Sequence, residues 1–239
     1  MESSFFIIFS LIFGAVFGSF ITAASYRLPK NESMLTRSHC PKCNQPLKIK
    51  SLIPIFSWLF QKGKCLNCQA KISVRYPITE LATSLLFLIS YLRFGFNWNT
   101  VIFNLIIVVC LIMIISDLET YIIPDSMQIS LLILSLIFIY YNNFDILYSV
   151  ISAIVYFGII FLSGFIVEKW KKKDAIGGGD IKFITIAGLV LGVSSLPFFF
   201  LFSGIFGVIF GLLWKKIKKN EYFPFGPALV VSFLSLLML

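Results

Sequence analysis

The sequence contains little charge. Asp, Glu, Lys and Arg make up 13% of its 239 residues, whereas soluble domains average about 25%. Hydrophobic residues make up 58% of the chain, and the mean hydropathy is +0.92. A water-soluble globular protein is therefore excluded, because no soluble core could cover this much apolar surface.

Apolar runs occur at eight places, most of them near the roughly 20 residues that a helix needs to cross a bilayer. We therefore predict an all-α polytopic membrane protein with about eight transmembrane helices. The first run lacks a preceding basic stretch and a following small-residue cleavage pattern, so we expect it to remain as an anchor. The predicted spans are residues 4–25, 77–92, 98–116, 126–141, 145–167, 181–194, 196–214 and 224–239.

Basic residues are nearly absent from one side of this predicted topology. Of 20 Lys and Arg residues, ten lie in 27–75, five in 169–182 and four in 215–219, which leaves only Arg93 for the other side. Short cytoplasmic loops collect such residues. We therefore place these three segments in the cytoplasm and expect their lysines to contact membrane lipids. The net charge of +9 reflects this topology, and no nucleic-acid partner is expected.

The one long polar segment, residues 26–76, contains two cysteine pairs of the form Cys-x-x-Cys. They are "CPKC" at Cys40 and Cys43 and "CLNC" at Cys65 and Cys68, with 21 residues between them. Four thiolates in two such pairs are typical of a tetrahedral zinc ribbon. Two disulfides are the alternative, but structural disulfides are rare in the reducing cytosol. We predict a structural Zn²⁺ site at these four cysteines, with His39 as a neighbour.

Acidic residues are scarce, yet two of them stand at ends of apolar spans on the predicted cytoplasmic side. Asp117 ends the third span in "SDLETYIIPD", and Asp180 begins the sixth in "GGGDIK". The glycine run lacks the Lys-Ser/Thr ending of a phosphate-binding loop. Each acid alone could be an ordinary interfacial residue, with Asp180 capping its helix. Together they could share a proton and activate water, which is the chemistry of an aspartic protease.

The order of motifs along nearly the whole chain resembles the bacterial type IV prepilin peptidase family of membrane aspartic proteases. The resemblance rests on "GSFITAASYRLP", both cysteine pairs, "IPIFSW", "ISVRYPITE", "SDLETYIIPD", "GGGDIK" and "FPFGPAL". It implies that Asp117 and Asp180 are the catalytic pair. It also implies cleavage of prepilins or pseudopilins after the leader glycine, in the bacterial cytoplasmic (inner) membrane, for pilus, competence or type II secretion assembly.

Many members of that family also methylate the new N-terminus with S-adenosylmethionine, and the resemblance implies the same bifunctional enzyme here. The sequence has no glycine-rich nucleotide motif of the soluble kind, so it identifies no residues for this cofactor. We expect a first transmembrane helix at 1–25, a Cys₄ zinc-ribbon-like domain at 26–76 and a polytopic peptidase domain at 77–239.

Three alternative functions remain open. One is a peptidase without methyltransferase activity, and another is a zinc-ribbon interaction module on a membrane anchor. The third is a proton-coupled membrane transporter, against which stand the interfacial position of the acids and the lack of repeated halves.

Overall fold

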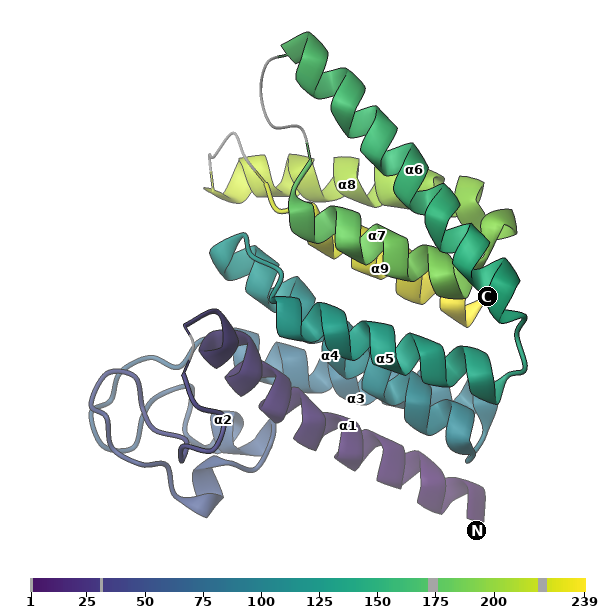
Figure 1. Ribbon diagram of the computed structural model, residues 1–239. Helices are drawn as coiled ribbons and strands as arrows, with labels where there is room; N and C mark the ends of the chain where they lie inside the picture. The colour runs from purple at the N-terminus through teal and green to yellow at the C-terminus, as the bar shows by residue number, and fades with distance from the viewer. Residues whose placement is uncertain (1, 31, 172–175, 219–222) are drawn as a thin grey trace. The chain divides into compact units, whose positions relative to one another are not determined.

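The computed structural model describes residues 2–30, 32–171, 176–218 and 223–239. The regular secondary structure among them is helical, and two isolated β-bridges, His39 with Pro46 and Lys64 with Lys71, lie in the polar segment that contains the cysteine pairs. Short 3-10 turns, η1 to η3, occupy Leu28–Lys30, Ile49–Ser51 and Val193–Ser195. The α-helices are drawn in Figure 1 and comprise α1 (Glu2–Arg27), α2 (Phe56–Phe60), α3 (Arg75–Phe94), α4 (Trp98–Thr120), α5 (Asp125–Tyr141), α6 (Ile146–Lys171), α7 (Gly178–Leu191), α8 (Leu196–Lys218) and α9 (Gly226–Met238).

Each apolar span predicted from the sequence coincides with one of these helices, so the all-α fold class is confirmed. Four helical stretches are long and apolar enough to cross a membrane, and α5 and α9 are shorter apolar helices. The count of eight transmembrane helices remains a prediction. The four long stretches are Ser4–Lys30, Trp98–Thr120, Ile146–Trp170 and Val193–Lys216.

Several helix ends differ from the predicted spans. Helices α4, α6 and α8 continue to Thr120, Lys171 and Lys218, about one turn beyond the predicted ends at residues 116, 167 and 214. Helix α7 covers Gly178–Leu191 rather than 181–194. The apolar run marks only the part of a helix that avoids water, whereas backbone hydrogen bonds set its ends. Helix α7 ends where Gly192 adopts a φ of 74°.

The chain forms two compact units, Met1–Ile112 and Met113–Leu239, whose boundary falls within α4. The predicted domains, 1–25, 26–76 and 77–239, have different boundaries from these compact units, and they remain a prediction. In the first unit, α1 and α3 lie side by side (Figure 1). A Cβ atom at Gly14 would come within 2.6 Å of Ser84 Cα, and one at Gly18 within 2.5 Å of Glu80 Cα. These glycines therefore allow the close approach that small residues give membrane helices.

In the second unit, α7 packs against α5, α6 and α9, and α8 packs against α9. The fully buried Tyr156 of α6 lies against Gly188 of α7, where a Cβ atom would come within 2.5 Å of the ring. Its hydroxyl donates a hydrogen bond to the carbonyl oxygen of Gly192 at 3.3 Å. Contacts on several sides thus fix α7, the helix that carries Asp180.

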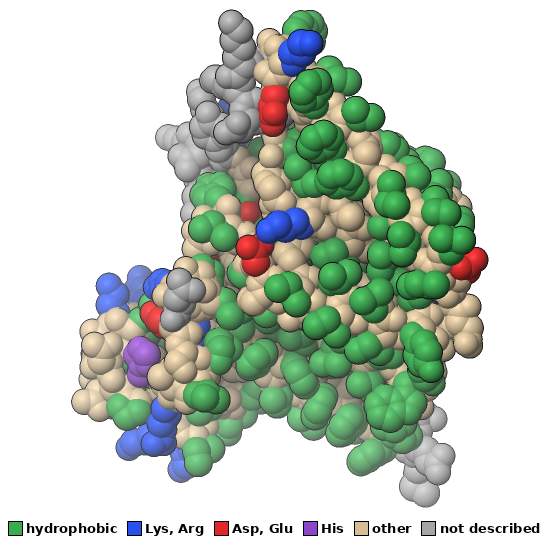
Figure 2. All heavy atoms as spheres, viewed as in Figure 1, with side chains coloured by type: hydrophobic (Ala, Val, Ile, Leu, Met, Phe, Trp, Pro, Cys, Tyr) green, Lys and Arg blue, Asp and Glu red, His purple; other side chains and the backbone are tan. Residues whose placement is uncertain are grey.

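Side-chain type differs sharply between the helices and the cysteine-containing segment. Figure 2 shows hydrophobic side chains over most of the visible helical surface, and Lys and Arg side chains around the segment that joins α1 to α3. Exposed apolar side chains line α1, α6 and α8. In a soluble protein such a surface would aggregate, whereas a bilayer solvates it.

Candidate active site and cysteine centre

Asp117 lies near the end of α4 and is buried. The helix ends one turn later, where Tyr121 adopts a φ of 56° and its backbone N–H donates to the carbonyl oxygen of Asp117 at 2.9 Å. The neighbouring Ser116 is fully buried. The carboxyl group is therefore enclosed by protein, although the loop that follows it is exposed.

Asp180 lies in the first turn of α7, as its third residue. The residue that caps this helix is Gly177, which has no side chain to bond the free N–H groups. The alternative reading of Asp180 as the helix cap is therefore wrong. A Cβ atom at Gly177 would lie 3.5 Å from Asp180 Oδ2, so the carboxyl group folds back over the beginning of the helix.

The structure brings Asp117 and Asp180 into one site within the second unit. Their carboxylates lie close enough for their charges to interact. The glycines beside the two acids both face Ile123, which comes from the loop between α4 and α5. Cβ atoms built at Gly179, next to Asp180, and at Gly226, next to Asp117, would each lie 3.3 Å from the Ile123 side chain.

Gly226, the first residue of α9, contacts Asp117 directly. Its backbone N–H donates to Asp117 Oδ2 at 3.0 Å, in a buried environment. A Cβ atom at this position would lie 2.6 Å from the same oxygen. Only glycine can therefore present its N–H here without displacing the carboxyl group. The bond also directs one end of Asp117 toward the positive end of the α9 dipole.

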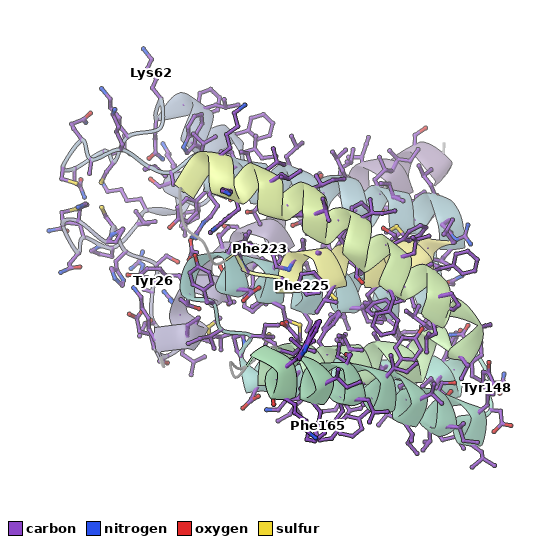
Figure 3. All side chains as sticks on the ribbon, turned by 90° about the horizontal axis from the view of Figure 1, so that it is seen from above. Tyr26, Lys62, Tyr148, Phe165, Phe223 and Phe225 are labelled. Carbon is purple, nitrogen blue, oxygen red and sulfur yellow. The ribbon has the colours of Figure 1, made fainter. Side chains whose placement is uncertain are left out.

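The segment before α9 is anchored on two glycines of α8. Phe223 and Phe225, labelled in Figure 3, pack edge to face with their ring centroids 6.2 Å apart. Cβ atoms would come within 2.6 Å of the Phe225 ring at Gly207 and within 3.4 Å of the Phe223 ring at Gly211. The sequence "FPFGPAL" carried the family resemblance, but spacing alone gave no hint that it reaches Asp117.

Two side-chain contacts join the start of α5 to the start of α7. Gln128 is buried, and its Nε2 donates to the carbonyl oxygen of Gly179 at 2.9 Å. On the surface, Lys182 Nζ lies 2.6 Å from Asp125 Oδ1. The sequence analysis gave Gln128 no role, because no motif pairs a glutamine with a glycine so distant along the chain.

The predicted metal ligands also come together. The sulfur atoms of Cys40, Cys43, Cys65 and Cys68 all lie within 4.8 Å of one another, and Cys40 Sγ lies 3.9 Å from Cys68 Sγ. Tetrahedral zinc with bonds of about 2.3 Å sets its sulfurs about 3.8 Å apart, whereas a disulfide bond is about 2.05 Å long. All four cysteines are free thiols. The donor set therefore fits zinc, and the exposed His39 is not part of the cluster.

The two cysteine pairs have the same backbone geometry. In one, Cys40 N–H donates to Gln45 O at 3.0 Å, and in the other, Cys65 N–H donates to Ala70 O at 2.9 Å. Figure 3 shows the sulfur atoms gathered in these loops, on the side of the picture that includes Lys62. Backbone N–H groups of Cys68 and Asn67 lower the pKa of the Cys65 thiol to about 6. Such bonds favour the thiolate, which is the form that binds a metal.

Comparison with known proteins decides the family. Residues 12–94 match the bacterial peptidase A24 N-terminal domain, and residues 104–212 match the type IV leader peptidase family. A prepilin leader peptidase/N-methyltransferase of Neisseria gonorrhoeae is 32% identical, over 96% of this chain and 89% of that protein. The chain belongs to the type IV leader peptidase family.

Other members of the family are equally similar. Proteins with the same name from Bacillus subtilis and Vibrio cholerae are 35% and 31% identical, over 92% and 98% of this chain and 89% and 96% of their own lengths. No solved structure matches the chain. The resemblance seen in the sequence is thus confirmed for both halves of the chain, and the family is one of bacterial membrane aspartic peptidases.

The relatives are also named N-methyltransferases. In the first unit, Glu80 is a buried carboxylate, and its Oε2 accepts a hydrogen bond from the backbone N–H of Ile55 at 2.6 Å. One such bond leaves other acceptor positions of a carboxylate open. It joins α3 to the residue that caps α2.

Proposed function

We propose that this enzyme cleaves prepilins or pseudopilins after the leader glycine with Asp117 and Asp180 as its catalytic pair. The observation that carries the proposal is the meeting of two carboxyl groups, from the end of α4 and the start of α7, in one partly buried site. Both belong to the segment matched by the leader peptidase family.

The chemistry follows from two carboxyl groups that share one proton. The ionised acid takes a proton from water, which attacks the scissile carbonyl, while the protonated acid donates a hydrogen bond to the carbonyl oxygen. The proton then passes to the departing amine. Because the Gly226 N–H donates to Asp117 Oδ2, that oxygen acts as an acceptor. The bond favours negative charge on that oxygen, so the shared proton is better accommodated on Asp117 Oδ1 or on Asp180.

The distribution of basic residues supports a site at the cytoplasmic boundary of the bacterial inner membrane. Five basic residues lie between 169 and 182, on both sides of Asp180, and short basic segments of this kind remain in the cytoplasm. A prepilin with a basic leader and an apolar helix would present its scissile bond at the same depth. The scissile bond would then reach the acid pair while the apolar helix of the substrate stays in the bilayer and its basic leader stays in the cytoplasm.

We assign zinc to the four cysteines in a structural role. Four protein sulfurs complete a tetrahedral site and leave no position for a reactive water. The ion would hold the two loops of residues 38–72 together, and hydrolysis would be left to the acids.

Cleavage of a purified prepilin by the enzyme in lipid nanodiscs tests the proposal. Asp117→Asn and Asp180→Asn keep the shape of each side chain, and each should lower kcat by at least about a thousandfold. Asp145→Asn, at an exposed acid that accepts a hydrogen bond from the Leu147 N–H, is the control and should keep full activity. Normal cleavage by either variant of the pair would refute the assignment, and an intact substrate with wild-type enzyme would favour a transporter or an interaction module.

The second activity is tested on the same product. With a labelled methyl donor, the new N-terminus should acquire label only after cleavage. A cleaved but unlabelled product would identify a peptidase without methyltransferase activity.

A further inference from the structure

We propose that Gln128 is a positioning residue, which holds the first turn of α7 so that Asp180 faces Asp117. The inference rests on the proposed function of the acid pair and adds a residue that does not itself touch the reacting atoms. Its basis is the hydrogen bond from Gln128 Nε2 to Gly179 O, 2.9 Å long and one residue from Asp180.

The burial of Gln128 is the first argument. Its side chain is 3% exposed, and its Oε1 atom has no hydrogen-bond partner within the described part of the chain. A buried amide with half of its hydrogen-bonding capacity unused is unfavourable for folding, and an apolar side chain of similar size would avoid that cost. The bond to Gly179 is therefore better explained by what it does for the site than by stability.

The second argument is the composition of the turn that Gln128 holds. Gly177, Gly178 and Gly179 precede Asp180 and have no side chains with which to pack. Glycines also leave the backbone with the greatest conformational freedom. A Cβ atom at Gly178 would find nothing within 4 Å. An external hydrogen bond to a backbone carbonyl is thus the means by which a neighbouring helix can restrain this turn.

The third argument is the position of Gln128 at the start of α5, next to the loop that joins α4 to α5. Gln128 lies in the first turn of α5, and the loop that leads into α5 begins just after Asp117. That loop also supplies Ile123, whose side chain lies against Gly179 and Gly226. One short segment therefore contacts the surroundings of both acids. The bond from Gln128 fixes their separation as well as the orientation of Asp180.

Gln128→Met and Gln128→Glu separate this role from simple packing. Methionine keeps the length but cannot donate, so kcat should fall about tenfold to a hundredfold, the effect of a displacement near 1 Å. KM should change little, because a buried side chain does not contact the substrate. Protonated glutamate can donate an O–H to Gly179 O, but ionised glutamate cannot. Burial at this position raises the pKa of a glutamate above its ordinary value of about 4.3. The activity of Gln128→Glu relative to wild type should therefore rise as the pH is lowered from about 8 to about 5.5, because more of the introduced side chain becomes protonated.

The charged groups near the introduced glutamate are Asp125 on α5, Asp180 and Lys182 on α7, and Asp117 on α4. Dividing each rate by the wild-type rate at the same pH removes the titration of these shared groups. Ser135→Ala, which removes a buried hydroxyl further along α5, is the control and should show a pH-independent ratio near one. It tests whether any polar deletion in this helix impairs the enzyme.

The outcomes are distinct. Wild-type kcat in Gln128→Met, or equal losses in the methionine and glutamate variants at every pH, would overturn the positioning role. The acid-pair variants belong in the same experiment. If Asp117→Asn and Asp180→Asn are inactive while Gln128→Met is normal, only this inference fails; if those two remain active, the proposed function fails first.

Discussion

The cysteine centre and the acid pair are assembled in different ways. All four cysteines lie within residues 40–68, in two loops with the same hydrogen bonds and spacing. The acids come from two helices, and the groups around them come from α5, α9 and the loop at Ile123. A metal site of this kind is specified locally, because its ligands are close in the chain. The acid site depends on how distant helices pack, so its supporting residues have no spacing rule.

Removal of the metal should have the largest effect on structure. Cys40→Ser takes away one of four ligands, and structural zinc contributes on the order of 10 kcal/mol to the folding of small zinc domains. We expect one zinc ion per wild-type chain and much less in the variant, with faster amide exchange across residues 38–72. Metal analysis and hydrogen exchange measure both.

Cys110→Ala is the matched control for the zinc experiment, since this buried cysteine lies in α4, outside the cluster. It should retain the metal in full. A wild-type enzyme that contains no stoichiometric zinc would contradict the assignment, even if the cysteines prove essential.

Gly226→Ala should have the next largest effect, this time on the acid site. The added Cβ atom would lie 2.6 Å from Asp117 Oδ2, so either the carboxyl group or the start of α9 must move. A displacement near 1 Å can lower kcat by about a hundredfold. Initial rates of prepilin cleavage measure the loss.

Gly204→Ala, in α8, is the control for this steric argument, because a Cβ atom there would meet nothing within 4 Å. It should be as active as wild type. Equal rates for both alanine variants would mean that Asp117 tolerates a different position, and the hydrogen bond from Gly226 would lose its importance.

These contrasts explain what the sequence could predict. Hydropathy located every long helix, because an apolar run is a local property, and the charge pattern gave a topology. Cysteine spacing located the four thiols that cluster in the structure, and the two acids stood out because charge is rare in such a chain. The contacts of Gln128 with Gly179 and of Gly226 with Asp117 could not be predicted, since each joins segments that only tertiary packing brings together. The cap at Gly177 was missed because capping rules favour the aspartate that follows.

Glycines at positive φ offer a smaller test within the first unit. Gly63 and Gly95 have φ values of 64° and 72°. With a ψ of −165°, Gly95 lies in a region that is essentially restricted to glycine, and such backbone strain costs on the order of 1–3 kcal/mol. At Gly63 a Cβ atom would come within 2.9 Å of the Trp58 ring, whereas at Gly95 it would meet nothing within 4 Å. Gly63→Ala should therefore destabilise the protein through the contact with Trp58 as well as through its backbone, and Gly95→Ala through its backbone alone.

Thermal unfolding of each alanine variant, with its zinc bound, measures the loss. A Gly63→Ala variant as stable as wild type would show that the Trp58 ring moves aside easily. The ring is held by a hydrogen bond from its Nε1 to Ile72 O at 3.2 Å, which is why we expect it to resist.

The smallest effect is expected at the surface contact between α5 and α7. Asp125 and Lys182 are 72% and 55% exposed, and exposed ion pairs contribute about 0–1 kcal/mol. Asp125→Asn should change stability by less than about 1 kcal/mol and kcat by less than about threefold. Any change should shrink as salt is added, because ions screen exposed charges. This contact joins the same two helices as the bond from Gln128 to Gly179. Asp125→Asn and Gln128→Met therefore compare an exposed ion pair with a buried hydrogen bond. A loss in Asp125→Asn as large as that in Gln128→Met, and unaffected by salt, would place the restraint on α7 at the surface instead.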